Sequence, residues 1–110
     1  MYYHTVQGTA PLRYSRDDAL KRIRRCLEDG ALILTKHFRD KLESEDLSMV
    51  EALHILRHGN IFNEPEFAVR HQEWNYRIEG TEPDGRHVAI VFAIVEGPTG
   101  VLITIFAVEA

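Results

Sequence analysis

Of all the features of this sequence, two apolar segments joined by a short turn most strongly limit the folds that the chain can adopt. The segments RHVAIVFAIV (86–95) and VLITIFAV (101–108) are rich in β-branched and aromatic residues, as strands are. The EGPTG between them supplies the proline and glycine of a turn. Strands joined by so short a connection pair in antiparallel fashion. The pattern predicts a β-hairpin that is apolar on both faces, so that both faces need cover.

A third strand is predicted ahead of this hairpin, before a turn with the sequence EPDG. Within WNYRIEG, Trp74, Tyr76 and Ile78 alternate with polar residues and therefore share one face of the strand. Arg77 lies on the opposite face, where it could pair with Glu79 or with an acid on the next strand. The three strands together predict an antiparallel meander.

Three helices are predicted ahead of the strands, and each has a recognisable cap. Ser15 begins the first helix, which ends at Gly30, and Thr35 begins a brief second one. Ser48 and Glu51 have the spacing of a capping box at the start of the third. We expect the buried stripe of the third helix to consist of Val50, Leu53 and Leu56.

Helices followed by strands predict an α+β domain. We expect two to three N-terminal helices packed on a three- to four-stranded antiparallel β-meander. The segment NIFNEPEF could add a short edge strand, where Pro65 is tolerated. Residues 1–14 are expected to be an N-terminal extension and residues 15–110 a single domain. A homodimer is one way to cover the second apolar face of the sheet.

Composition and charge reduce the number of functions that are open to this chain. No segment approaches the roughly 18 apolar residues of a membrane span, so we expect a cytoplasmic protein with no membrane partner. The single Cys26 is expected to be a small core residue. A net charge of −4 argues against avid nucleic-acid binding. The charge is uneven, however: residues 1–41 hold nine Lys or Arg against five acids, so a local basic surface is compatible with an acidic chain.

Several segments together resemble a bacterial family labelled domain of unknown function 4258. They are LTKHFRDKL, SMVEALHILRHGNI, EPEFAVRHQEWNYRIEGTEPDGR and the closing strands, and they span about residues 15–108. The family in turn looks like the motility quorum-sensing regulator (MqsR) toxins and, more distantly, like the RelE and barnase-like ribonuclease fold. The resemblance implies a metal-independent ribonuclease, the toxin of a toxin–antitoxin system, held inactive by a cognate antitoxin.

Cleavage of RNA without a metal needs a base, an acid and cations around the phosphate. Imidazole exchanges protons near neutral pH, guanidinium holds phosphate by forked hydrogen bonds, and a tyrosine can donate or stack on a base. The candidate catalytic residues are His37, His71 and Arg77. The candidate substrate-binding residues are Arg39, Arg70 and Tyr76.

Each candidate also has a structural interpretation. His37 lies in the first turn of a helix and could bond a neighbouring carbonyl, and His71 is typical of an exposed loop. Tyr76 shares its face with Ile78 and is more typical of a core residue. The remaining histidines, expected on the surface, are His4, His54, His58 and His87.

A non-catalytic role is the main alternative. The toxins place lysine near their last strand, whereas GVLITIFAVEA has no basic residue, which favours a protein-binding or regulatory domain, or an inactive descendant of the toxin fold. His54 and His58 are four residues apart, but no third ligand accompanies them, so we expect neither a metal nor another cofactor. The enzyme hypothesis requires the fold to bring His37 and Arg39 close to His71 and Arg77.

Overall fold

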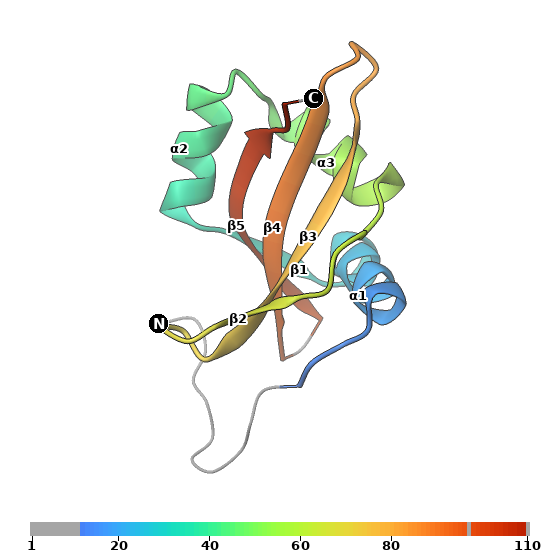
Figure 1. Cartoon of the computed structure of the whole chain (residues 1–110), viewed down its shortest axis with the longest axis vertical. Coiled ribbons are helices and arrows are strands. Elements are labelled where there is room, and N and C mark those ends of the chain that lie inside the picture. The colour runs from blue at the N-terminus through green and yellow to red at the C-terminus, as the bar shows by residue number, and fades with distance from the viewer. Residues whose placement is uncertain (1–11, 97, 110) are drawn as a thin grey trace.

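Five strands form one sheet in the order β1-β5-β4-β3-β2 (Figure 1). The computed structural model describes residues 12–96 and 98–109, so residues 1–11 of the expected N-terminal extension lie outside the described part. The elements in chain order are α1 (Arg16–Asp29), β1 (Ala31–Leu34), α2 (Lys36–Ser44), α3 (Met49–His58), β2 (Glu66–Ala68), β3 (Glu73–Thr81), β4 (His87–Val95) and β5 (Thr99–Ala107).

The expected α+β class is confirmed, but the sheet is mixed and not purely antiparallel. The meander of β3, β4 and β5 forms as predicted, and β2 adds a short edge strand. The difference is β1, which pairs with β5 in parallel, with Ile33 opposite Val101. The parallel direction is possible because helices and three strands separate β1 from β5 in sequence.

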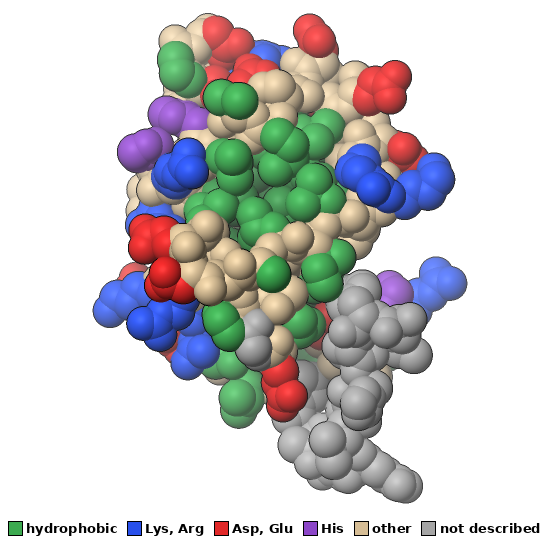
Figure 2. All heavy atoms as spheres, turned by 180° about the vertical axis from the view of Figure 1, so that it is seen from behind, with side chains coloured by type: hydrophobic (Ala, Val, Ile, Leu, Met, Phe, Trp, Pro, Cys, Tyr) green, Lys and Arg blue, Asp and Glu red, His purple; other side chains and the backbone are tan. Residues whose placement is uncertain are grey.

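The helices pack on one face of the sheet, and the core lies between them and the strands. In Figure 1, α1 and α3 lie behind the sheet and α2 lies beside β5. Figure 2 shows the molecule from behind, where hydrophobic side chains gather in the middle of the helical side. The largest fully buried side chains include Tyr76, Phe38, Phe92, Ile23, Ile55 and Leu56. The face turned away from α1 and α3 is called the outer face below.

All three predicted helix starts are confirmed. The hydroxyl of Ser15 accepts a hydrogen bond from the backbone N–H of Asp18, at 3.1 Å. Ser48 and Glu51 form the complete capping box. Each hydroxyl thereby satisfies an N–H group that the helix itself cannot pair.

The predicted buried stripe of α3 is confirmed for Leu56 and wrong for Val50, while Leu53 is partly buried against the core. Val50 is 77 % exposed, and the buried residues of this helix are Ala52, Ile55 and Leu56. The reason is a close contact with the sheet just after the helix ends. A Cβ atom added to Gly80 would lie 3.1 Å from the Cα of Gly59. This approach of two glycines sets the rotation of α3, and Val50 turns outward.

Removing the Thr35 hydroxyl is expected to destabilise the domain by about 1–2 kcal/mol. The hydroxyl accepts the N–H of Phe38 and donates to the carbonyl of Leu102, both at 3.0 Å. It therefore caps α2 and anchors α2 to β5. Urea denaturation of Thr35→Ala measures the loss. Thr35→Ser should retain most of the stability, and Ser44→Ala, at the exposed end of α2, should change it little. An equal loss from Ser44→Ala would contradict this role.

Candidate functional site

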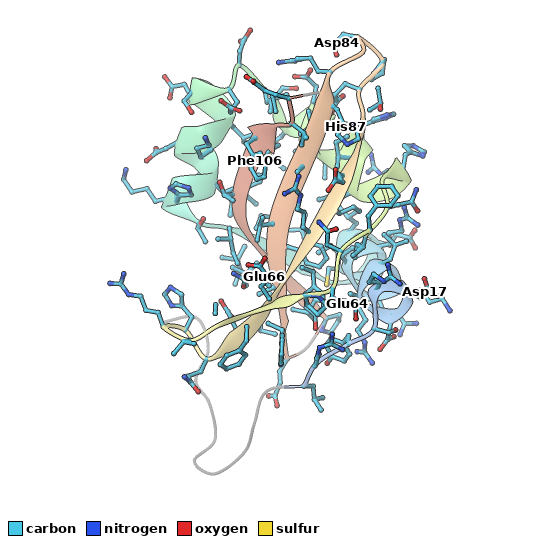
Figure 3. The ribbon with its side chains drawn as sticks, in the orientation of Figure 1. Asp17, Glu64, Glu66, Asp84, His87 and Phe106 are labelled. Carbon is cyan, nitrogen blue, oxygen red and sulfur yellow. The ribbon has the colours of Figure 1, made fainter. Side chains whose placement is uncertain are left out.

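Polar side chains gather on the outer face of the sheet, where the outward row of β3 is polar and β4 carries Ala89 and Val91 beyond His87. Arg77 and Glu79 come from β3 and His87 from the start of β4. Figure 3 views this face, with His87 on β4 and Phe106 on β5 both labelled. We call the three polar residues the Arg77–Glu79–His87 cluster.

Glu79 lies at the centre of this cluster and contacts both other members. Its Oε2 is 2.9 Å from Nε of Arg77, and its Oε1 is 3.0 Å from Nε2 of His87. The other imidazole nitrogen, Nδ1, lies 3.3 Å from the hydroxyl of Thr81. The predicted pairing of Arg77 with Glu79 is thus confirmed. One carboxylate is placed between a guanidinium and an imidazole, with a hydroxyl behind the imidazole.

Exposure differs across the cluster in a way that suits a reaction site. The side chain of Glu79 is 13 % exposed, whereas those of Arg77 and His87 are 35 % and 38 % exposed. The carboxylate is therefore shielded from bulk water, while a ligand can reach the guanidinium and the imidazole. Shielding strengthens the attraction between unlike charges because fewer water molecules screen it.

Phe106 supports the guanidinium from the neighbouring part of the sheet. The Cζ atom of Arg77 lies 5.1 Å from the centroid of the Phe106 ring, within the range of a cation–π contact. The buried Nε of Arg77 is close to Glu79 but makes no well-aligned hydrogen bond. Charge and the aromatic ring therefore hold this side chain more than hydrogen-bond geometry does.

Strand register explains why these residues meet. Arg77 and Glu79 are two positions apart on β3, so both side chains lie on the outer face. The turn after β3 is closed by the N–H of Glu82, which donates to the carbonyl of Arg86 at 2.7 Å. This turn places Thr81 opposite His87. His87, expected only to be a surface residue, thus comes within reach of Glu79. The length of the turn between β3 and β4 is the sequence signal that could have identified His87 as a neighbour of Glu79.

The structure places Tyr76 in the core. The side chain is 1 % exposed and stacks on Phe92 with ring centroids 5.6 Å apart. Its hydroxyl accepts the backbone N–H of Tyr14 at 2.9 Å, and burial raises the pKa of the phenol. Tyr76 therefore supports the sheet from the side opposite to Arg77, where a substrate on the outer face does not reach it.

His37 and Arg39 lie on different sides of α2. They are two residues apart in the helix, which separates their side chains by roughly 200° around the helix axis. The buried residues of α2 are Phe38 and Leu42, and His37 and Arg39 are the exposed neighbours of Phe38 on its two sides. His37 and Arg39 therefore flank the buried side of α2 and point in different directions. These two side chains do not converge on one phosphate.

Arg70 and His71 lie in the exposed turn between β2 and β3. The N–H of His71 donates to the carbonyl of Ala68 at 3.2 Å within this turn. From Glu73, where β3 begins, to Arg77 the strand extends about 13 Å. Of the six candidates, the structure therefore brings only Arg77 into the cluster. The others lie on α2, in the β2–β3 turn or in the core.

Other candidate sites are weaker. Arg24, on the basic face of α1, donates to the carbonyls of Leu56 and Gly59 at 3.2 and 2.7 Å, so it ties α1 to the end of α3.

Among residues 12–96 and 98–109, no group of three or more His, Cys, Asp or Glu side chains is arranged to hold a metal ion. No helix within these ranges is long and apolar enough to cross a membrane.

Comparison with known proteins gave one match. A family model described as "Domain of unknown function (DUF4258)" matches residues 34–107. The match covers well over half of the chain and contains the whole Arg77–Glu79–His87 cluster, whereas α1 lies outside it. No curated protein and no solved structure matches the chain.

Proposed function

The chain belongs to the DUF4258 family, and from this premise we propose that it is a metal-independent ribonuclease with the Arg77–Glu79–His87 cluster as its active site. The observation that carries the proposal is the contact of one shielded carboxylate with both an imidazole and a guanidinium. These are the three groups that metal-free RNA cleavage requires: a base, an acid and a cation for the phosphate.

In the proposed reaction, Glu79 accepts the proton of the 2′-hydroxyl as the 2′-oxygen bonds to phosphorus. The bond from phosphorus to the 5′-oxygen breaks, and protonated His87 gives its proton to that oxygen. The products are a 2′,3′-cyclic phosphate and a free 5′-hydroxyl. The proton then passes from Glu79 to His87 across their 3.0 Å contact, which restores both groups. Arg77 neutralises the charge that develops on the phosphate.

Cations around the outer face support the binding of an RNA strand. Arg70 and His71 are exposed in the β2–β3 turn, and His37 is exposed in the first turn of α2. Phosphates beyond the one being cleaved could contact these side chains. In this proposal His37, Arg70 and His71 bind substrate, and a cognate antitoxin would act by covering the outer face.

The test is an RNA cleavage assay with the purified full chain in the presence of EDTA. Wild type should release a 2′,3′-cyclic phosphate product, and Glu79→Gln should abolish most of this activity. Glu66→Gln is a matched control, because it makes the same change at an exposed carboxylate on neighbouring β2. Intact RNA with folded wild type, or undiminished cleavage by Glu79→Gln, would overturn the proposal. Induced expression of the same three proteins, scored by growth, tests the toxin assignment.

A protein-binding role without catalysis is the second candidate. The observation that favours it is the exposed apolar edge formed by β2 and the turn after it. Phe67 is 36 % exposed and Val69 is 71 % exposed, and β2 is the edge strand of the sheet. Such an edge can pair with a strand of a partner or of a second copy. Absence of cleavage together with a tight complex with a partner protein would favour this role.

A further inference from the structure

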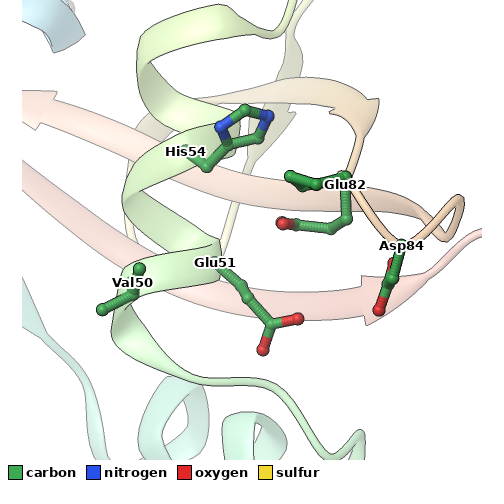
Figure 4. A pocket seen from close by; sticks show the side chains of 6 residues that line it. Val50, Glu51, His54, Glu82 and Asp84 are labelled. Atoms are coloured by element: carbon green, nitrogen blue, oxygen red, sulfur yellow. The ribbon is translucent and has the colours of Figure 1, made fainter.

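A small pocket opens between α3 and the turn that joins β3 to β4 (Figure 4). Its volume is about 260 Å³, and it is lined by Val50, Glu51, His54, Glu82, Pro83 and Asp84. Glu82 continues the inner row of β3, after Ile78 and Gly80, and therefore faces α3. The Arg77–Glu79–His87 cluster faces the other way, so the two sites are separate.

Glu82 is the unusual group in this pocket. It is 3 % exposed, and its Oε1 has no hydrogen-bond partner within the described part of the chain. In Figure 4 the carboxyl group points from the turn toward α3. The N–H of Gly85 donates to the backbone carbonyl of Glu82 at 2.8 Å, so the turn holds the backbone from which this side chain extends. A buried acceptor without a donor is costly, and a ligand that donates a hydrogen bond would remove that cost.

The other two acids of the pocket already have a cation. Arg86 binds Glu51 at 2.7 Å and Asp84 at 3.0 Å. Glu51 also accepts two hydrogen bonds from Ser48 in the capping box. Glu82 is therefore the carboxyl group in the pocket whose charge is not paired in these contacts.

We propose that this pocket binds an organic cation with N–H donors, either a primary ammonium or a guanidinium group, on an aliphatic stem. The head group would donate to Oε1 of Glu82, and because the single Arg86 is shared by Glu51 and Asp84, these two lining residues add a net negative charge. The stem would pack on Val50 and Pro83, the apolar part of the lining. A bare metal ion fits less well, because it needs several ligands at fixed geometry and no such group is present in the described residues.

The proposal does not depend on ribonuclease activity. The cation could come from a free amine or from a lysine or arginine side chain of a partner protein. The two sources share the same head group and stem, and they differ in the backbone to which the stem is attached. Butylammonium and butylguanidinium represent the first source, and a capped Gly-Arg-Gly tripeptide represents the second.

The test is a titration of the ¹⁵N-labelled full chain followed by NMR. Saturable shifts are expected for the backbone amides of residues 50–54 and 82–86. Glu82→Gln should weaken binding at least about tenfold, the loss expected when a charged hydrogen bond is removed. Glu43→Gln, an exposed acid on α2, is the matched control and should bind as wild type does. Tighter binding of the tripeptide than of the free amines would identify the partner side chain as the source.

Two results would overturn the proposal. One is the absence of a saturable shift with any of the three probes, and the other is binding by Glu82→Gln that is as tight as binding by wild type. A response to MgCl₂ alone would replace it with a metal site. Each result leaves the RNA cleavage assay unaffected, so the two proposals fail separately.

The pH dependence of stability gives a second measurement on the same variant. Burial raises the pKa of Glu82, and the neighbouring Glu51 and Asp84 raise it further, against the opposite influence of His54 and Arg86. A raised pKa means that the folded state holds this proton to higher pH than the unfolded state, so stability falls as pH rises through that interval. Glu82→Gln should therefore unfold at a higher temperature than wild type at pH 7 and at the same temperature well below pH 4. A lower melting temperature at pH 7 would contradict the burial of an unpaired charge.

Discussion

Replacing His87 by glutamine is expected to slow RNA cleavage by about 10²- to 10⁴-fold, the usual contribution of a general acid. Glutamine keeps an N–H donor that can contact Glu79, but it cannot deliver a proton to the leaving 5′-oxygen. The loss should therefore appear in the rate of a single turnover at saturating RNA and leave RNA binding largely unchanged. A quenched-flow assay with a defined oligonucleotide measures both quantities.

His58→Gln makes the same change on the opposite side of the sheet and is the control for His87→Gln. His58 is exposed at the end of α3, where its ring packs on that of His54 with centroids 4.8 Å apart. This variant should cleave RNA as fast as wild type. Equal rates for His87→Gln and wild type, with both proteins folded by NMR, would remove His87 from the mechanism. A loss of binding with an unchanged turnover rate would make it a substrate-binding residue.

Replacing Phe92 by alanine is expected to cost about 3–5 kcal/mol of folding free energy. Phe92 is fully buried in β4, which has strands on both sides, and its ring stacks on Tyr76 at 5.6 Å. Deleting the ring removes this contact and leaves a cavity that the surrounding strands cannot close. The free energy of unfolding of a small domain is only about 5–15 kcal/mol in total, so the variant should lose a large part of its stability. Urea denaturation at 25 °C measures the difference.

Two further variants keep this prediction testable if Phe92→Ala does not fold. In Phe92→Leu the leucine fills most of the space left by the phenylalanine ring, so this variant should lose clearly less folding free energy than Phe92→Ala. Val91→Ala changes the neighbouring residue, which lies on the outer face and is partly exposed, and should cost less again. A loss from Val91→Ala as large as that from Phe92→Leu would mean that the core does not lie between β4 and the helices.

Local sequence patterns predicted those parts of the fold that depend on neighbours in the chain. Caps and turns involve residues a few positions apart, so the three helix starts and the three long strands could be predicted. The strand β1 could not, because four residues carry no clear periodicity and its partner β5 lies far along the chain. The rotation of α3 also depends on a distant contact, that of Gly59 with Gly80.

The candidate site shows the same division. Arg77 and Glu79 could be paired from strand alternation alone. His87 was missed because it begins an apolar run, and only the register set by the turn at residues 82–86 brings it to Glu79. His37 and His71 are reasonable residue types for acid–base chemistry, but their place relative to Arg77 depends on how α2 and the β2–β3 turn pack, which no local pattern fixes.

The position of β5 in the sheet has a consequence for synthesis on the ribosome. β5 is made after every other strand, yet it lies between β1 and β4. Until it emerges, β1 has no strand to pair with in this sheet, α2 lacks the carbonyl of Leu102 that anchors Thr35, and the apolar edge of β4 stays open. Folding therefore cannot finish progressively from the N-terminus and must wait for one late event. The nascent chain should bind chaperones until β5 inserts, and then be released in a single step.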